Sequence, residues 1–125
     1  MFEAEMKKTQ EAILKKAKEY IKNPQYITDL FDMSIVWCSK ELAAMAEYSV
    51  EELLEKRVPD LLDNGMTDLQ KREYALESIP QGKGESTTTM ISKSGKKYNV
   101  TFRFIHVMYE GGSYEVGELM KADPM

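Results

Sequence analysis

Hydrophobic residues among the first 22 positions recur at helical spacing. Phe2, Met6, Ile13, Ala17 and Tyr20 lie three, four or seven positions apart, which places them on one stripe of an amphipathic helix. The pattern ends at residues 23–24, because a proline disfavours helical geometry in the residue before it. We therefore predict a helix over residues 2–22. Acidic residues interrupt its basic face and argue against a membrane-surface helix, which leaves a helix docked on its own domain or one used for dimerisation or signalling.

The pattern changes to a strand pattern after the proline. Residues 25–31 and 34–38 are β-prone runs separated by a short turn, which predicts a β-hairpin. Ser39 occupies the position of a helix N-cap before residues 40–46. Ser49, followed three positions later by Glu52, has the spacing of a capping box and predicts a second short helix.

The middle of the chain predicts more helix. Pro59 begins another short turn. A longer helix is expected over residues 64–78, and residues 79–84 are expected to form a loop because they combine proline with two glycines.

The last third predicts three strands, over residues 85–92, 96–108 and 114–122. In the second of these strands, Phe102 and Phe104 share one face, and Ile105 and Val107 lie on the other. The strand is therefore apolar on both faces near its end, so that a second layer must cover the outer face. The helix over residues 2–22 is the natural cover, in cis or in trans.

This order of elements predicts one α+β domain. A five-stranded antiparallel sheet would carry a helical insertion between its second and third strands, preceded by the N-terminal amphipathic helix. We divide the chain into residues 1–23, which hold the helix, and residues 24–125, which hold the domain.

Several residues at the joints between these elements carry a family resemblance. They are Asp29, Ile35-Val36-Trp37 leading into Ser39, Tyr48-Ser49 with Glu51-Glu52-Leu53, Ser94-Gly95, and Val116-Gly117 ahead of Asp123. Together they resemble a PAS domain over about residues 25–123. The chain departs from the family pattern at Asp32 and Glu47, which stand where glycine is usual, and at Ser39, which stands where asparagine is usual.

The resemblance implies a non-enzymatic sensory or regulatory domain. PAS domains bind a small ligand or cofactor between sheet and helices, or dimerise, and bias an attached output domain. The alternative is a ligand-free module for protein–protein interaction or dimerisation. The expected partners are a second copy of the chain, a small apolar ligand, and an output domain or signalling partner such as a kinase or transcription regulator.

Two sets of residues follow from this interpretation. The candidate ligand pocket is lined by Trp37, Leu54, Leu62, Met66, Leu69, Met90, Phe102 and Phe104. The candidate dimer interface is formed by Phe2, Met6, Ile13, Ala17, Tyr20, Ile105 and Val107. No buried charge is evident in the pocket pattern to indicate a ligand class.

The sequence leaves the cofactor unknown. Haem-binding members of the family generally present a histidine from the long helix, and residues 64–78 contain none; the single histidine, His106, is expected to be a packed strand residue. The cysteine motif of flavin-binding members is also missing, and Cys38 is expected to be a buried apolar filler. The spacing of possible ligands predicts no metal site. An enzyme using Asp29 or Glu73 as a base would need a carboxylate of raised pKa within the pocket.

Composition agrees with a small globular domain. The chain has 125 residues, 42% of them hydrophobic and 30% charged, with a formal net charge of −4. An acidic balance does not favour nucleic acid as a partner, and no apolar run reaches the length of about 18 residues that a membrane span needs. The N-terminus lacks the apolar core of a signal peptide, and a single cysteine is typical of a reducing compartment. A cytoplasmic location is therefore expected.

Overall fold

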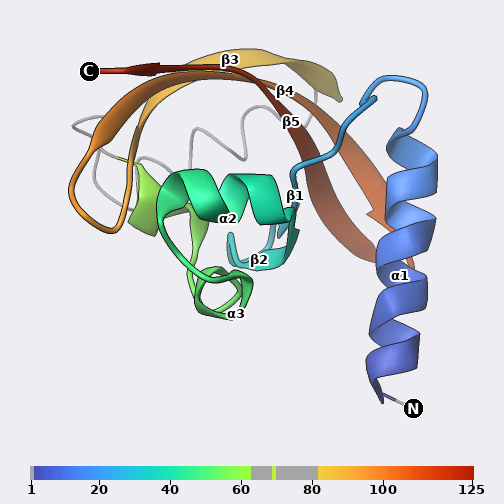
Figure 1. Ribbon diagram of the computed structural model, residues 1–125. Helices are drawn as coiled ribbons and strands as arrows, with labels where there is room; N and C mark the ends of the chain where they lie inside the picture. The colour runs from blue at the N-terminus through green and yellow to red at the C-terminus, as the bar shows by residue number, and fades with distance from the viewer. Residues whose placement is uncertain (1, 63–68, 70–81) are drawn as a thin grey trace.

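Five antiparallel strands form one sheet with the order β2-β1-β5-β4-β3 (Figure 1). The computed structural model describes residues 2–62, 69 and 82–125. The strands are β1 (Tyr26–Asp29), β2 (Ile35–Cys38), β3 (Lys83–Ile91), β4 (Lys97–Tyr109) and β5 (Gly112–Pro124). The predicted α+β architecture, with its helical insertion between the second and third strands, is confirmed. The long helix predicted over residues 64–78 lies outside the described residues, except for Leu69.

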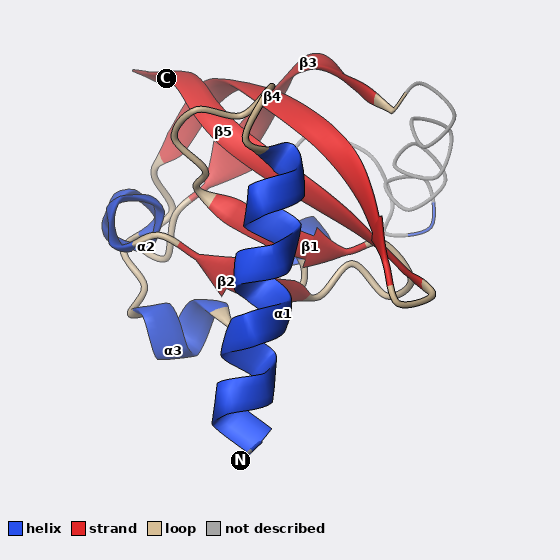
Figure 2. Ribbon diagram, turned by 90° about the vertical axis from the view of Figure 1, so that its right-hand side faces the viewer, coloured by secondary structure: helices blue, strands red, loops and turns tan. Residues whose placement is uncertain are grey.

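Helices lie on both faces of this sheet. They are α1 (Phe2–Ala17), α2 (Lys40–Ala46), α3 (Val50–Leu53) and a 3-10 helix, η1 (Val58–Leu61). Figures 1 and 2 show α1 against one face, the outer face, while α2 and α3 lie on the opposite, inner side. Within the described ranges, no helix combines the length and the hydrophobicity that crossing a bilayer requires.

Both predicted helix caps are present. The Ser39 side chain accepts a hydrogen bond from the Leu42 N–H at the start of α2. At the start of α3, the Ser49 hydroxyl accepts from the Glu52 N–H, and the Glu52 carboxylate accepts from the Ser49 N–H. Each cap satisfies backbone donors that the first helical turn leaves without partners.

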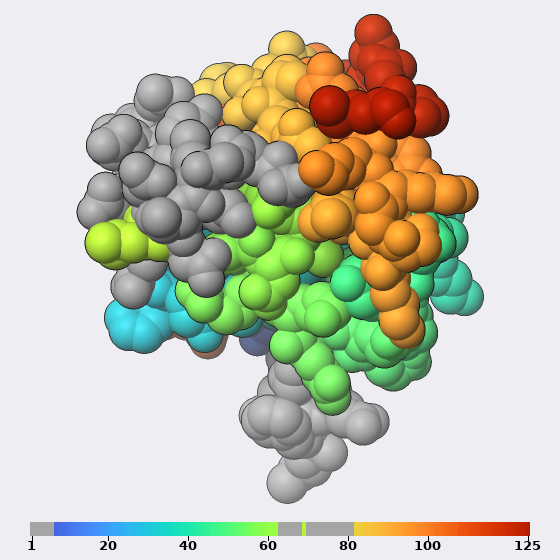
Figure 3. Space-filling model, turned by 90° about the vertical axis from the view of Figure 1, so that its left-hand side faces the viewer, coloured from blue at the N-terminus to red at the C-terminus, as the bar shows by residue number. Residues whose placement is uncertain are grey.

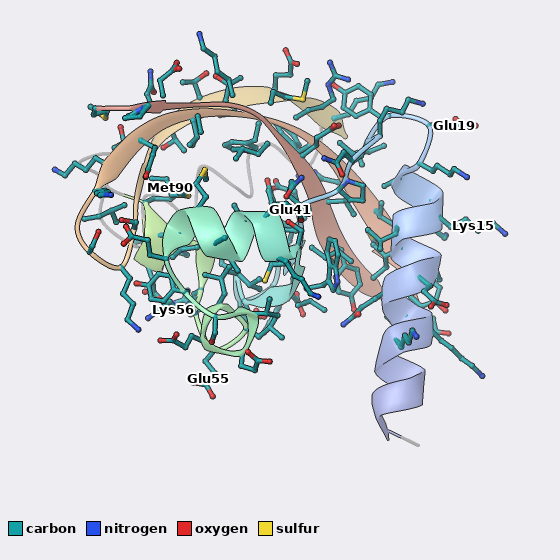
Figure 4. The ribbon with its side chains drawn as sticks, in the orientation of Figure 1. Lys15, Glu19, Glu41, Glu55, Lys56 and Met90 are labelled. Carbon is teal, nitrogen blue, oxygen red and sulfur yellow. The ribbon has the colours of Figure 1, made fainter. Side chains whose placement is uncertain are left out.

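The inner hydrophobic core lies between the sheet and α2, α3 and η1. Its buried members are Ile35, Cys38, Ala43, Ala46, Leu53, Leu61, Met90 and Val100. Figure 4 shows Met90 pointing from β3 toward α2. This core contains strand and helix residues in similar numbers, as expected where short helices close one face of a sheet.

The outer face of the sheet is covered by α1 of the same chain. Ile13, Ala17 and Ile21 pack on the β-strand residues Val107 and Val116, and the Ile13 side chain is completely buried. Lys15 and Glu19, on the other side of this segment, point away from the sheet (Figure 4). The need for a cover over Ile105 and Val107 is therefore met in cis.

Several predicted boundaries differ from the structure, and contacts with the sheet explain two of them. The helix α1 ends at Ala17 rather than at residue 22, because the chain turns so that the Lys22 N–H meets the Glu118 carboxylate and the Gln25 N–H meets the Gly117 carbonyl. Residues 83–84, expected in a loop, belong to β3 because they pair with Ile105 and Phe104.

We expect Ile13→Ala to lower the free energy of unfolding by about 2–5 kcal/mol, because it removes a fully buried side chain and leaves a cavity under α1. Lys15→Ala, on the exposed side of the same helix, should change it by less than about 0.5 kcal/mol. Urea unfolding of the two variants and the parent measures both values. An Ile13→Ala variant as stable as the parent would show that α1 does not cover the sheet in solution.

A polar contact joins the end of α2 to the β3–β4 turn. Glu47 caps α2 in the left-handed region, with φ 65°, and its carboxylate accepts hydrogen bonds from the Ser94 and Ser92 hydroxyls at 2.6 and 2.7 Å. Beside it, Lys93 Nζ lies 2.8 Å from a Glu52 carboxylate oxygen. Figure 3 shows this turn, in orange, against the helices in green. The hydroxyls of Ser94 and Ser92 lower the pKa of Glu47 below its ordinary value.

We expect Glu47→Gln to destabilise the protein at pH 7 and to have a much smaller effect at pH 3. A carboxyl whose pKa is lowered by folding stabilises the folded state above its ordinary pKa, near 4.5, and this contribution is lost as the pH falls through the folded-state value. Urea unfolding at the two pH values tests the difference.

The matched control is Glu55→Gln. Glu55 is exposed just after α3, and its carboxylate makes no hydrogen bond within the part of the chain that the structure describes. Its substitution should leave the stability nearly unchanged at both pH values. A Glu47→Gln effect of equal size at pH 7 and pH 3 would contradict an anionic role for the Glu47 side chain.

Candidate functional site

A row of polar side chains crosses three strands on the inner face of the sheet. Thr28 of β1 is paired with Glu115 of β5, and Glu115 is paired with His106 of β4. Since side chains at directly paired positions lie on the same face of a sheet, these three are neighbours. They share their face with Phe104 and Val100, two and six positions before His106 on β4. We call Thr28, Glu115 and His106 the polar row.

Glu115 is the centre of this group. One of its carboxylate oxygens accepts a hydrogen bond of 2.9 Å from the Tyr26 hydroxyl, and the other lies 3.3 Å from Nε2 of His106. The Glu115 side chain is only 16% exposed and that of His106 only 7%. Burial raises the pKa of Tyr26 well above its ordinary value, and the negative charge of Glu115 and the hydrogen bond to it act in the same direction. Tyr26 is therefore a neutral hydrogen-bond donor to Glu115 at physiological pH.

Aromatic rings continue the same face beyond the polar row. The ring centroids of Phe104 and His106 are 5.3 Å apart, and those of Phe102 and Phe104 are 6.2 Å apart. Tyr26 meets Phe102 edge to face at 6.3 Å. The Tyr26 ring lies directly over Gly117, where any Cβ would overlap with it. Because residue 117 is a glycine, the Tyr26 ring can lie over β5, and its hydroxyl can bond with Glu115, two positions earlier on that strand.

Thr28 adds an unusual group to the site. Its side chain is 1% exposed, and its hydroxyl oxygen has no hydrogen-bond partner among the described residues. A buried hydroxyl without a partner costs about 1–3 kcal/mol, so such groups are uncommon in folded proteins. The polar row therefore contains one hydroxyl that is free to bond with another molecule.

Some of the predicted pocket residues do lie together. Met90 and Phe104 are buried on the inner side, Phe102 is half-buried there, and Leu62 forms a β-bridge with Met90. Met66 lies outside the described residues. Whether these residues hold a ligand stays a prediction.

Three of the predicted pocket residues are misplaced. Leu54 and Leu69 are 40% and 66% exposed, so they do not line the core. Trp37 packs with the α1 cluster on the outer face, because the β1–β2 register shifts by one residue at Val36. This bulge turns Val36 and Trp37 toward the same side.

The predicted dimer residues are largely used within one chain. Ile13, Ala17 and Val107 are buried against each other, and the Tyr20 ring lies within 5.1 Å of Lys83 Nζ and 5.3 Å of the Arg103 guanidinium. Ile105 packs at the edge of the same cluster. The side chains of Phe2 and Met6 lie outside the described residues. The five of these residues whose side chains the structure describes therefore pack within one chain, and whether the chain forms a dimer stays a prediction.

The remaining chemical candidates are positioned as follows. Cys38 is buried, as predicted, and burial raises the pKa of its thiol. His106 is a packed strand residue, as predicted. The Asp29 carboxylate accepts a hydrogen bond from the Phe31 N–H in the β1–β2 turn at 2.8 Å, and Glu73 lies outside the described residues. No group of three or more metal-binding side chains occurs among the residues with described positions.

The inward-facing carboxylate of Glu115 was not predicted from the sequence. Glu115 lies between Tyr114 and Val116 in the last strand, and its inward direction depends on a register that the local pattern does not reveal. The inner face carries a charge that the pocket pattern did not reveal, since the Glu115 side chain is only 16% exposed. The alternation of Glu115 with Val116 shows only that the two side chains point to opposite faces, and not which of them points inward.

The fold is that of PAS domains. Similar structures include a PAS domain from a two-component sensor histidine kinase, which is 18% identical over 91% of this chain and 99% of that chain, with a TM-score of 0.66. The PAS domain of an HTR-like protein from Haloarcula marismortui is 15% identical over 94% and 97% of the two chains, with a TM-score of 0.63. The LOV domain of the blue-light photoreceptor Aureochrome1 is 21% identical over 86% and 81%, with a TM-score of 0.63.

No protein-family model matches the chain, and no curated protein sequence matches it. At the identities found, the likeness to solved structures shows the fold alone. The predicted PAS-like architecture is thereby confirmed.

We expect Tyr26→Phe to lower the free energy of unfolding by about 1–3 kcal/mol, because it leaves the largely buried Glu115 carboxylate with one hydrogen bond fewer. The control is Tyr98→Phe on the inner side of β4, since the Tyr98 hydroxyl has no hydrogen-bond partner within the described ranges. Its loss should change stability by less than about 0.5 kcal/mol. Equal effects of the two substitutions, measured by urea unfolding, would refute the Tyr26–Glu115 bond.

Proposed function

We propose that this chain is a non-enzymatic sensory domain in signal transduction, which binds a small ligand on the inner face of its sheet and passes the binding event to α1. The observation that carries the proposal is the alternation along β4 and β5. His106 and Glu115 belong to the polar row, and their next neighbours, Val107 and Val116, contact α1 on the outer face. One pair of strands thus contacts both the candidate site and the helix.

The mechanism we propose is a shift in the packing of α1. A ligand that contacts His106 or Glu115 adjusts the local twist of β4 and β5, and this moves the surface on which Ile13 and Ala17 rest. Well-packed interfaces respond to small displacements by moving between discrete arrangements. A ligand with a higher affinity for one arrangement increases its population.

The partners in this proposal receive the state of α1. Its outer surface is lysine-rich, and Lys15 and Glu19 point away from the sheet (Figure 4), so an output domain or a second copy of the chain can contact this side while Ile13 remains buried. A homodimer would then use the exposed side of α1, since Ile13, Ala17 and Val107 are buried within one chain. The single buried cysteine supports a cytoplasmic location, where thiols stay reduced.

Native mass spectrometry of the freshly purified full chain tests ligand binding. We expect a non-covalent mass that leaves on denaturation. Phe104→Leu should reduce its occupancy, because Phe104 is buried beside the polar row. Phe31→Leu is the matched control, since Phe31 is 79% exposed in the β1–β2 turn, and its occupancy should equal that of the parent.

Hydrogen exchange tests the coupling to α1. The amides of residues 7–17 should exchange more slowly in the ligand-loaded chain than in the stripped and refolded chain. A native mass equal to that of the chain alone would refute the sensory proposal and favour the ligand-free interaction module. A bound ligand that leaves the exchange of α1 unchanged would retain the binding site and refute the coupling.

A further inference from the structure

We propose that the ligand of the inner face is a flat, apolar molecule that carries a protonated amine, and that Glu115 is its counter-ion. This inference rests on the proposed function and adds the chemical class of the ligand. It depends on the charge of the polar row, on its unused hydrogen-bonding capacity, and on the shape of the neighbouring rings.

Among the described residues, little compensates the negative charge of Glu115. The only ion-pair partner of Glu115 within the described part of the chain is His106, which is neutral unless protonated. Its contact with Glu115 is long, at 3.3 Å. Arg103, which is nearby on β4, points to the outer face and contacts Glu85 and Tyr20. A buried carboxylate is costly unless a cation or several donors accompany it, so this site favours a positively charged ligand.

The unused hydrogen-bonding capacity consists of acceptors. An ionised carboxylate has about four lone-pair positions, and the described residues provide Glu115 with two contacts, from Tyr26 and His106. Thr28 is paired with Glu115 in the β1–β5 register, and its hydroxyl is buried with no partner among the described residues. A protonated amine has three N–H donors and no acceptor, and it can use both the Glu115 carboxylate and the Thr28 oxygen.

The neighbouring surface suits an aromatic body. Phe102 and Phe104 continue the face from His106 with centroid distances of 6.2 and 5.3 Å. Gly84 lies against the Phe104 ring, where a Cβ would come within 3.3 Å of Cζ. Aromatic rings pack offset or edge to face at such distances, and their faces attract a nearby cation.

The test uses three probes that share an indole ring and differ in the group at the end of the side chain: tryptamine, which is cationic, tryptophol, which is neutral, and indole-3-propionate, which is anionic. Isothermal titration of the full chain at pH 7 measures their affinities. We expect tryptamine to bind at least about tenfold more tightly than tryptophol, because a charge-assisted hydrogen bond is about twice as strong as a neutral one. Indole-3-propionate should bind more weakly than either.

Glu115→Gln should reduce the preference for tryptamine over tryptophol to less than about twofold. The matched control is Glu118→Gln, the same change on the same strand. The Glu118 carboxylate accepts a hydrogen bond from the Lys22 N–H, close to α1 and away from the polar row. This control should keep the full preference. Thr28→Val removes the free hydroxyl without a change of charge and should weaken tryptamine binding about two- to tenfold. This variant keeps the inference testable if Glu115→Gln does not fold.

Three results would overturn the inference. These are equal affinities for tryptamine and tryptophol, a preference for tryptamine that survives Glu115→Gln, and tighter binding of indole-3-propionate. Failure of the inference remains distinct from failure of the proposed function. A neutral or anionic molecule found on the purified chain by native mass spectrometry would refute the amine and retain the sensor, whereas a bare chain that binds none of the three probes would refute both.

Discussion

The pairing of β4 with β5 is the interaction on which the rest of the structure depends. Each strand has 13 residues, and they are paired from Tyr98 to Tyr109 of β4. Their side chains alternate between two hydrophobic layers, so that Val100 belongs to the inner core and Val107 to the cluster under α1. Neither layer would be held in place without this hairpin, because α1 and the inner helices pack on opposite faces of it (Figure 1).

Local signals in the sequence predicted most of the elements. The hydroxyls of Ser39 and Ser49 cap the helices at which they were expected, because a cap is decided within one helical turn. Predictions failed where a distant strand decides the outcome. The end of α1 is determined by the contact of Lys22 with Glu118, 96 positions away, and Trp37 is turned to the outer face by a bulge in the β1–β2 register.

The residues of the candidate site also differ in whether local sequence could predict them. Apolar members such as Met90 and Phe104 could be predicted, because hydrophobic residues in a strand that alternates with polar ones lie inside. Thr28 and Glu115 could not, since their burial is a property of the register of three strands and not of the residues themselves. In a sheet, a one-residue change of register would move each of them to the other face. Polar site residues on strands therefore need the pairing before they can be recognised.

The packing of α1 on strands of the same chain has a consequence for protein synthesis. Lys16 contacts the Met108 carbonyl across 92 positions, and the Val116 surface is later still in the sequence. During synthesis α1 leaves the ribosome before the strands that receive it, at about 5–20 residues per second. For those seconds Ile13 and Ala17 have no sheet to cover them. The growing chain must carry an uncovered apolar stripe until its last strand is complete, which is the period when chaperones are most useful to it.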